Sequence, residues 1–390
     1  MGPVGRTRLP GLPFPPDKTM TTQVQAAVSR ATGAPLSIET LQLGELRKDE
    51  VLVRVVATGV CHTDIGMRDA PARVPKPIVL GHEGAGIVEQ VGSAVSKVKP
   101  GDHIVMTFNT CGHCPSCYQG HSAYCQELAT LNFGGKRRDG TTAFAGAEAP
   151  TYSHFFGQSS FATHAICSER NAIPVRKDIP LEILGPLGCG IQTGAGSILN
   201  SLKVAPGDHV GIFGTGSVGL AAVMAARLAG AATVIAVDTK ASRLDMAIEL
   251  GATHAIDASR EDTFARIQAI RSYGLNHIVD TTGNLKAIRQ AVEHLAPRGV
   301  CGLINTAKGA DVNANILSMV LGGRSIRGIH QGDSNPDIFI PQLVEFYDQG
   351  RFPFDRLISF YELNDINTAL DDMESGKAIK PVIRMPGAGA

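Results

Sequence analysis

The N-terminal part of the chain has short hydrophobic stretches rich in β-branched residues and separated by turn residues, a pattern that predicts β-strands. Residues 51–57 and 86–91 are examples, and turn residues such as Lys99-Pro100-Gly101-Asp102 follow them. Residues 20–110 are therefore predicted to form a β-rich, barrel-like domain. Residues 111–160 are rich in cysteine, glycine and polar side chains without a sustained period. We expect a lobe there whose fold depends on an added cross-link.

The pattern changes at about residue 190, where short apolar strands begin to alternate with helix-forming segments. Such alternation predicts a parallel sheet covered by helices on both faces. After residue 331 the alternation is lost, and two further helical segments follow. The predicted strands are 210–213, 233–237, 276–281 and 298–304, and the predicted helices are 217–229, 242–250, 284–296, 341–349 and 364–374.

Composition narrows the possible classes of protein. Lysine and arginine number 36, as do aspartate and glutamate, so nothing favours a nucleic acid or an anionic membrane as partner. No apolar run reaches the roughly twenty residues of a membrane span. Residues 1–19 lack the apolar core of a secretory signal and contain two arginines but no serine, unlike a transit peptide. We expect a disordered tail, or an upstream start codon with Met20 as the working start, and a cytoplasmic protein.

A glycine motif follows the strand 210–213, in the order Gly214-Thr215-Gly216-Ser217-Val218-Gly219. The first glycine permits a tight turn, the second lets the backbone approach a pyrophosphate, and the third lets the helix pack closely on the strand. Unpaired N–H groups at the start of that helix attract phosphates. Strand, motif, helix, next strand and acid occur in the order of a dinucleotide site.

The acid is Asp238, nineteen residues after Gly219, and its carboxylate can accept hydrogen bonds from an adenosine ribose diol. The same charge repels a 2′-phosphate, and Thr239 is not an arginine, so NAD is favoured over NADP. Arg243, one helical turn further, either reaches the ribose edge or is a solvated helix residue.

Four cysteines lie within fifteen residues, as Cys111-x2-Cys114-x2-Cys117-x7-Cys125. Four thiolates from one loop suit a closed, tetrahedral, structural zinc site. An iron–sulfur run also begins C-x2-C-x2-C, but its fourth cysteine comes earlier. Disulfide or redox pairing is a further alternative, disfavoured without an export signal. His113 and His121 are possible alternate ligands.

A second metal site is suggested by Cys61 in GVCHTD, His82 in GHEGAG and Cys189 in GCG, although each alone could be an ordinary core residue. Together GVCHTD, GHEGAGIVE, the four-cysteine loop, GCGIQTG and GTGSVG resemble the zinc-containing alcohol dehydrogenases of the medium-chain dehydrogenase/reductase superfamily. The resemblance covers essentially residues 20–390. LNFGGKRRDGTTAF and GIHQGDS are similar to the aryl-alcohol (benzyl alcohol) branch.

This resemblance implies that Cys61, His82 and Cys189 bind a catalytic zinc with a fourth position left for water or alcohol. Zinc lowers the pKa of a bound hydroxyl. The resemblance further implies that Thr63 receives the alcohol proton and that Asp64 orients His82.

Three more roles come from the resemblance. Glu83 would lie behind the metal as electrostatic support. His62 and Lys380 would each contact the cofactor pyrophosphate, with a surface charge as the plain alternative.

The chain departs from the family at two positions. Gly66 stands where liver-type enzymes have the histidine that ends their proton relay, so the proton leaves through the ribose, water or another group. Ala129 stands where the glutathione-linked formaldehyde branch has an arginine, with Arg137 and Arg138 unassigned nearby. Phe108 is expected either in the alcohol pocket or in the core. Cys167 and Cys301 are expected in the core.

We therefore predict an α/β protein with a GroES-like catalytic zinc domain at 20–190 and 332–390 and an NAD-binding Rossmann domain at 191–331. The expected reaction is reversible oxidation of a primary aryl or allylic alcohol to the aldehyde with NAD+. The family also implies a dimer or tetramer. The alternatives are S-(hydroxymethyl)glutathione dehydrogenase, a zinc-free reductase of the same superfamily and a non-enzymatic zinc protein that binds other proteins.

Overall fold

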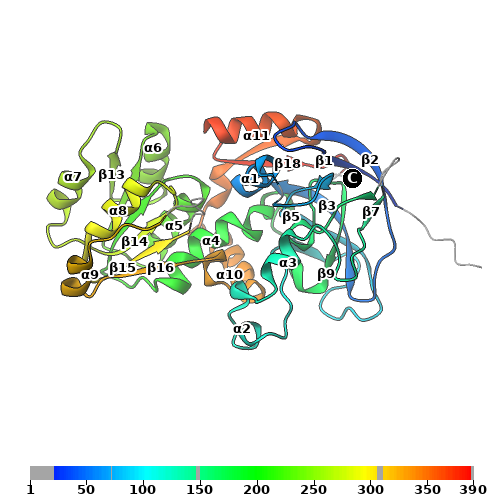
Figure 1. Cartoon of the computed structure of the whole chain (residues 1–390), viewed down its shortest axis with the longest axis horizontal. Helices are drawn as coiled ribbons and strands as arrows, with labels where there is room; N and C mark the ends of the chain where they lie inside the picture. The colour runs from blue at the N-terminus through cyan, green and yellow to red at the C-terminus, as the bar shows by residue number, and fades with distance from the viewer. Residues whose placement is uncertain (1–21, 72, 146–149, 305–310, 388–390) are drawn as a thin grey trace, which may run out of the picture.

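The computed structural model places two bodies of different architecture side by side along the long axis of the molecule (Figure 1). It describes residues 22–71, 73–145, 150–304 and 311–387. The expected tail at 1–19 lies outside the described residues. In the part of the chain that is described, no helix has the length and apolar character needed to cross a membrane.

The first body is β-rich, as predicted, and its strands form two sheets. One has the order β4-β1-β2-β7-β8, and the other has the path β10-β6-β5-β3-β18-β17 with β9 paired to β3. Strand β18 pairs antiparallel with β3, with Val382 opposite Gly59, so the C-terminal segment completes the sheet that the N-terminal segment begins. The strands are β1 (Thr22–Ser29), β2 (Ser37–Leu43), β3 (Glu50–Gly59), β4 (Ile78–Val79), β5 (Glu83–Val91), β6 (His103–Met106), β7 (Phe144–Ala145), β8 (Pro150–Thr151), β9 (His164–Ser168), β10 (Ala172–Pro174), β17 (Ile358–Glu362) and β18 (Lys380–Arg384).

The second body is a six-stranded sheet of order β13-β12-β11-β14-β15-β16, in which every pair is parallel. The chain moves outward from β11 in one direction and then in the other, so β11 and β14 flank the switch point where such sheets bind ligands. This confirms the predicted Rossmann-like fold. The strands are β11 (His209–Phe213), β12 (Thr233–Asp238), β13 (His254–Asp257), β14 (Leu275–Asp280), β15 (Leu295–Leu303) and β16 (Ser325–Gly328).

Helices cover the parallel sheet and line the boundary between the bodies (Figure 1). Helix α10 begins at Pro336, earlier than the predicted residue 341, because Pro336 occupies the first turn, where its missing N–H costs nothing. The prediction had started that helix at Pro341, which lies inside it. The helices are α1 (His62–Asp69), α2 (Pro115–Tyr118), α3 (Leu128–Phe133), α4 (Gly190–Gly196), α5 (Ser217–Leu228), α6 (Ala241–Leu250), α7 (Thr263–Ile270), α8 (Leu285–Glu293), α9 (Ile316–Gly322), α10 (Pro336–Asp348) and α11 (Ile366–Ser375).

Helix α4 connects the two bodies and is buried along its whole length. It packs so closely on α5 that a Cβ on Gly194 would lie 2.0 Å from the carbonyl oxygen of Val218. The residue that precedes α4 is Cys189, and α5 follows the glycine motif. This contact therefore brings the expected metal ligand next to the expected dinucleotide site.

Candidate metal and cofactor site

Three separate segments bring Cys61, His82 and Cys189 together. Cys61 follows β3 and caps α1, His82 immediately precedes β5, and Cys189 caps α4. One ligand atom from each of these residues, and one from Glu83, lie within 4.8 Å of one another. Residues up to 128 positions apart in sequence thus form one cluster, where the end of a β-sheet meets the start of a helix.

The ligand atoms of this cluster fit a zinc ion. The Nε2 atom of His82 is buried and has no hydrogen-bond partner among the described residues, although burying such an atom unpaired is costly. The neighbouring Cys189 thiol holds the pKa of Cys61 well below its usual range, so Cys61 is disposed to be a thiolate. Two sulfurs and one imidazole nitrogen form the Cys2His set of a catalytic zinc with one open position.

Asp64 holds both the helix and the histidine. Its Oδ2 accepts the backbone N–H of Cys61 at 3.0 Å, which caps α1. Its Oδ1 accepts the backbone N–H of Gly81 at 3.1 Å and lies 3.0 Å from Nδ1 of His82. A proton on Nδ1 leaves Nε2 free for the metal, as in other carboxylate–histidine–metal arrangements. This is the arrangement the resemblance implied for Asp64.

Aromatic rings fix the other faces of His82. Phe156 stacks on the imidazole with centroids 4.5 Å apart, and Phe155 meets it edge-on at 5.5 Å. Phe156 has a φ of 51°, a left-handed value that a bulky residue rarely adopts. Backbone strain is thus retained where it places a ring on a metal ligand.

Lys380 forms a buried ion pair that the sequence did not predict. Its ammonium is buried and lies 2.9 and 3.0 Å from the carboxylate oxygens of Glu83 and 3.1 Å from the carbonyl oxygen of Val60. Burial raises the pKa of Glu83, which Lys380 opposes, and the carboxylate in turn holds the pKa of Lys380 above its usual value. Lys380 therefore neutralises a buried carboxylate behind the metal cluster, and its contact with a cofactor phosphate stays a prediction.

The remaining predicted residues of this segment lie at the start of α1. Thr63 places Oγ1 3.7 Å from Sγ of Cys61, which is adjacent to the metal position. His62 is exposed at the first residue of the helix. A Cβ on Gly66 would meet nothing within 4 Å, so the position that ends the proton relay in other enzymes is open space here.

The four-cysteine lobe forms a second cluster. Its four sulfurs lie within 4.8 Å of one another, and they belong to Cys111, Cys114, Cys117 and Cys125. The lobe has little regular structure, since α2 and α3 are the only α-helices described in it. Backbone N–H groups point at the sulfurs, and a hydrogen bond from the N–H of Gln126 lowers the pKa of Cys114 to about 6. A closed set of four sulfurs fits a structural zinc. His113 lies to the side, 3.2 Å from Glu127, and is not among the four.

The glycine motif leaves space for a dinucleotide at the start of α5. A Cβ on Gly219 would lie 1.9 Å from the carbonyl oxygen of Gly214, so only glycine lets α5 pack this closely on β11. A Cβ on Gly216 would meet nothing within 4 Å, so open space lies beside the backbone N–H groups of the helix. This space suits a pyrophosphate. Val218 approaches α4 from the same turn.

Asp238 ends β12 beside this motif. Its Oδ2 accepts the backbone N–H of Thr215 at 2.6 Å, and its Oδ1 accepts the N–H groups of Thr239 and Lys240 at 2.7 and 3.0 Å. The carboxylate thus holds the glycine loop against the next strand. Nε of Arg243 is buried without a hydrogen-bond partner among the described residues.

Comparison with known proteins agrees with this geometry. Residues 47–177 match the alcohol dehydrogenase GroES-like domain, and residues 217–348 match the zinc-binding dehydrogenase family. Geraniol dehydrogenase of Castellaniella defragrans is 48% identical over 362 residues, which are 92% of this chain and 97% of that protein. The chain belongs to the zinc-containing alcohol dehydrogenases of the medium-chain dehydrogenase/reductase superfamily.

Two solved structures share the complete fold of this alcohol dehydrogenase. An alcohol dehydrogenase zinc-binding domain protein from Burkholderia ambifaria has a TM-score of 0.93 at 53% identity and covers 94% of this chain and 100% of its own. Benzyl alcohol dehydrogenase from Acinetobacter calcoaceticus has a TM-score of 0.91 at 43% identity and covers 93% and 99%.

Several residues near the site were not found from the sequence. Phe155, Phe156 and the ion pair of Lys380 had no local signal, because each depends on contacts between distant segments.

Arg137 is not a free cation: it pairs with Glu50 at 2.6 Å, and both side chains are buried. Arg138 pairs with Glu127 at 2.9 Å. Cys167 and Cys301 are fully buried, as expected of core residues.

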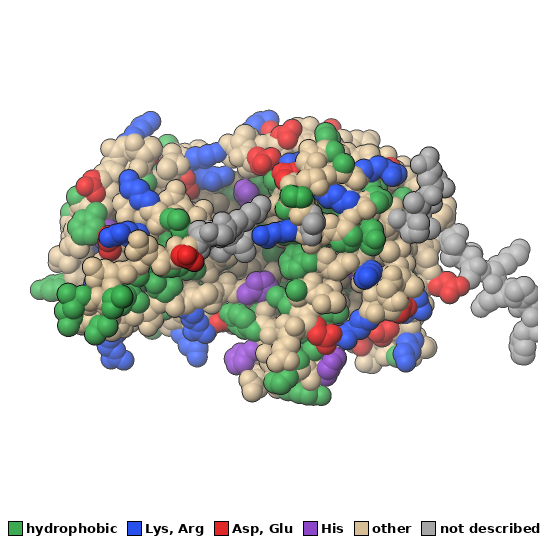
Figure 2. All heavy atoms as spheres, viewed as in Figure 1, with side chains coloured by type: hydrophobic (Ala, Val, Ile, Leu, Met, Phe, Trp, Pro, Cys, Tyr) green, Lys and Arg blue, Asp and Glu red, His purple; other side chains and the backbone are tan. Residues whose placement is uncertain are grey.

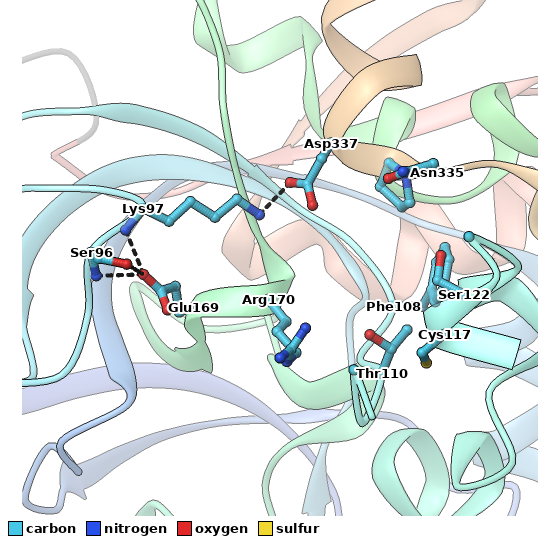
Figure 3. Close-up of a pocket in the computed structure, with 13 residues that line it drawn as sticks. Ser96, Lys97, Phe108, Thr110, Cys117, Ser122, Glu169, Arg170, Asn335 and Asp337 are labelled. Carbon is cyan, nitrogen blue, oxygen red and sulfur yellow. Dashed lines mark hydrogen bonds and ion pairs between the residues drawn. The ribbon is translucent and has the colours of Figure 1, made fainter. Parts of the chain in front are cut away.

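A separate pocket of about 320 Å³ lies between the cysteine lobe and the start of α10 (Figure 3). Phe108 lines it, is almost fully buried, and lies edge-on to His330 with centroids 6.5 Å apart. Lys97 extends across the pocket to pair with Asp337 (Figure 3). The pocket's lining includes none of Cys61, His82 or Cys189.

Proposed function

We propose that this alcohol dehydrogenase oxidises primary alcohols whose hydroxyl-bearing carbon adjoins an aromatic ring or a double bond, with NAD+ as hydride acceptor. The observation that carries the proposal is the Cys61–His82–Cys189 cluster with its unpartnered Nε2. When bound there, zinc supplies a Lewis acid that makes a substrate hydroxyl more acidic and favours loss of hydride from its carbon.

The side chains of this chain divide the remaining tasks. Asp64 keeps the proton of His82 on Nδ1. Thr63 receives the substrate proton at Oγ1. Because Gly66 offers no side chain, the proton would pass to water or to a ribose hydroxyl of a bound cofactor, with His62 as an exposed group at the same helix start. Excluding water and positioning the reactants account for the protein's share of the catalysis.

The NAD assignment is supported by the carboxylate of Asp238 and the open space beside Gly216. A fixed negative charge at the end of β12 disfavours a 2′-phosphate. Arg243 is close enough in sequence to contact the adenosine ribose.

The substrate class is supported by two relatives. One is named for geraniol, a primary allylic alcohol, and the other for benzyl alcohol, a primary aryl alcohol. The glutathione-linked alternative loses support because Ala129 is not an arginine and Arg137 is held by Glu50.

The test is a metal count combined with NADH absorbance over an alcohol panel. We expect two zinc ions per chain and the highest kcat/KM for benzyl, cinnamyl and geraniol-type alcohols. Preference for secondary alcohols or for S-(hydroxymethyl)glutathione would contradict the substrate class. One zinc per chain, or a Cys189→Ser variant with full turnover and full metal content, would contradict the site itself.

We also propose a cytoplasmic location. None of the eight cysteines forms a disulfide in the described residues, which suits a reducing compartment.

A further inference from the structure

Gln331, which has no role in the proposed reaction, contacts the sulfur of Cys189, a candidate ligand of the catalytic metal. Nε2 of Gln331 lies 3.7 Å from Sγ of Cys189, and the side chain is 5% exposed. Oε1 of the same amide lies 3.4 Å from Oγ1 of Thr193, whose single hydroxyl hydrogen is donated to the carbonyl oxygen of Cys189 at 2.7 Å. In the structure the NH2 end of the amide faces the sulfur, so an N–H group points at Cys189.

Gln331 belongs to residues 329–334, the bridging segment, which connects β16 to the residues before α10. Gln331, Gly332 and Asp333 all have φ between 50° and 65°. Gly332 packs directly on α4, because a Cβ there would lie 2.5 Å from the carbonyl oxygen of Gln192. Oγ of Ser334 donates to Oε1 of Gln192 at 2.7 Å. A strained backbone pressed on a buried helix holds the glutamine in one position.

The cysteine lobe also forms hydrogen bonds with the bridging segment. The hydroxyl of Tyr124 hydrogen-bonds the carboxylate of Asp333 and lies 3.3 Å from the backbone nitrogen of His330. Nδ1 of His330 lies 3.0 Å from the carbonyl oxygen of Ala123. Arg327 pairs with Asp333 at 3.0 Å, which holds the carboxylate toward the tyrosine. Tyr124 immediately precedes Cys125, so these hydrogen bonds come from a residue next to a candidate ligand of the structural metal.

We propose that the cysteine lobe supports the catalytic metal centre through the bridging segment, with Gln331 as the positioning residue that donates an N–H to the sulfur of Cys189. This inference rests on the proposed function, because it requires a metal at Cys61, His82 and Cys189. It assigns the lobe a role in the geometry of the catalytic site in addition to local stabilisation.

The physical basis is the effect of a hydrogen bond on a thiolate ligand. An N–H directed at the sulfur withdraws electron density and restricts rotation about the Cα–Cβ bond, so both the donor strength and the direction of the ligand are set. Loss of a partner outside the ligand set commonly lowers metal affinity 10–100-fold. The nitrogen–sulfur distance here suits a hydrogen bond to sulfur.

The experiment replaces zinc by Co²⁺ in the full-length protein and compares four variants. Gln331→Met removes the donor while keeping the length of the side chain, and Gln331→Glu replaces the N–H donor by an acceptor while keeping the shape of the amide. Tyr124→Phe removes the hydroxyl through which the lobe hydrogen-bonds the bridging segment. Asn367→Ala is the matched control, because its amide hydrogen-bonds the backbone of Leu36 and not the bridging segment.

We expect both Gln331 variants to shift the thiolate-to-cobalt absorption band and to release zinc to a chelator about 10-fold faster from one of the two sites. Tyr124→Phe should shift the band in the same direction by less, and Asn367→Ala should leave it unchanged. Circular dichroism verifies that each variant is folded.

Wild-type spectra and release rates in both Gln331 variants would overturn the proposal. An unchanged band in Tyr124→Phe would overturn the role of the lobe. A wild-type protein that takes up only one cobalt would instead overturn the proposed function, so the two failures are distinguishable.

Discussion

Single residues determine the electrostatics behind the metal cluster, and Lys380 is the clearest case. Lys380→Met leaves the carboxylate of Glu83 buried without its cation, so we expect the free energy of unfolding to fall by about 3–5 kcal/mol. Urea unfolding at pH 7 measures this. The double variant Glu83→Gln, Lys380→Met removes both charges and should recover much of the loss. Equal stability of the single variant and the wild type would show that the pair is not structural.

Asp64 is the second residue whose effect can be measured directly. Asp64→Asn weakens the hold on Nδ1 of His82 and on the N–H of Cys61, so catalytic zinc affinity should fall about 10–100-fold while the lobe keeps its metal. Zinc counts after dialysis against a chelator measure this. Asp69→Asn, at the far end of the same helix, is the control and should retain both ions.

At the scale of elements, Glu50 ties the start of β3 to the long segment that follows the cysteine lobe. Burial raises the pKa of Glu50, but hydrogen bonds from His154 and Arg137 outweigh it and bring the pKa to about 2. A carboxyl whose pKa is lower in the folded protein stabilises it above its ordinary pKa and loses that effect as the pH falls. Stability from this group should therefore be complete above about pH 4.5 and disappear toward pH 2.

Glu50→Gln tests this dependence. The variant leaves Arg137 buried without its charge partner, so at pH 7 we expect it to be less stable by about 3 kcal/mol. Denaturant unfolding from pH 7 to pH 3 should show the difference shrinking. Glu39→Gln, in the partly exposed pair with Arg30, should change stability by less than about 1 kcal/mol at pH 7. A pH-independent gap for Glu50→Gln would contradict the argument.

The sequence predicted elements well where periodicity was long. Helix α5 and strands β11, β12 and β14 lie where the apolar pattern placed them, because buried parallel strands and their covering helix leave a clear signal. Strand β13 and helix α7 are short and partly exposed, and they were not predicted. Of the site, the ligand residues were identified through motifs. The Lys380–Glu83 pair, the rings on His82 and the contact of Gln331 with Cys189 join distant segments, so no local pattern reveals them.

At the scale of the whole molecule, the outer end of the parallel sheet is unusually apolar. Ile316, Leu317, Val320 and Leu321 of α9 are 66–80% exposed, and Figure 2 shows hydrophobic side chains gathered in this region. The neighbouring strand β16 is an edge strand of the described sheet. Large exposed apolar patches and open sheet edges mark association sites. We propose that a second copy of the chain covers this face about a two-fold axis.

The double variant Leu317→Asp, Val320→Asp tests that proposal. Two carboxylates on the patch would have to lose their hydration in the interface, so we expect the dimer to dissociate at micromolar concentration. Sedimentation equilibrium gives the mass. Because α9 lies away from the metal cluster, each monomer should keep both zinc ions, and any loss of turnover would then report on domain stability. Tyr273→Asp, which changes an exposed apolar residue elsewhere in the parallel-sheet body, should leave the mass unchanged. If α9 is not the interface, the double variant keeps the wild-type mass.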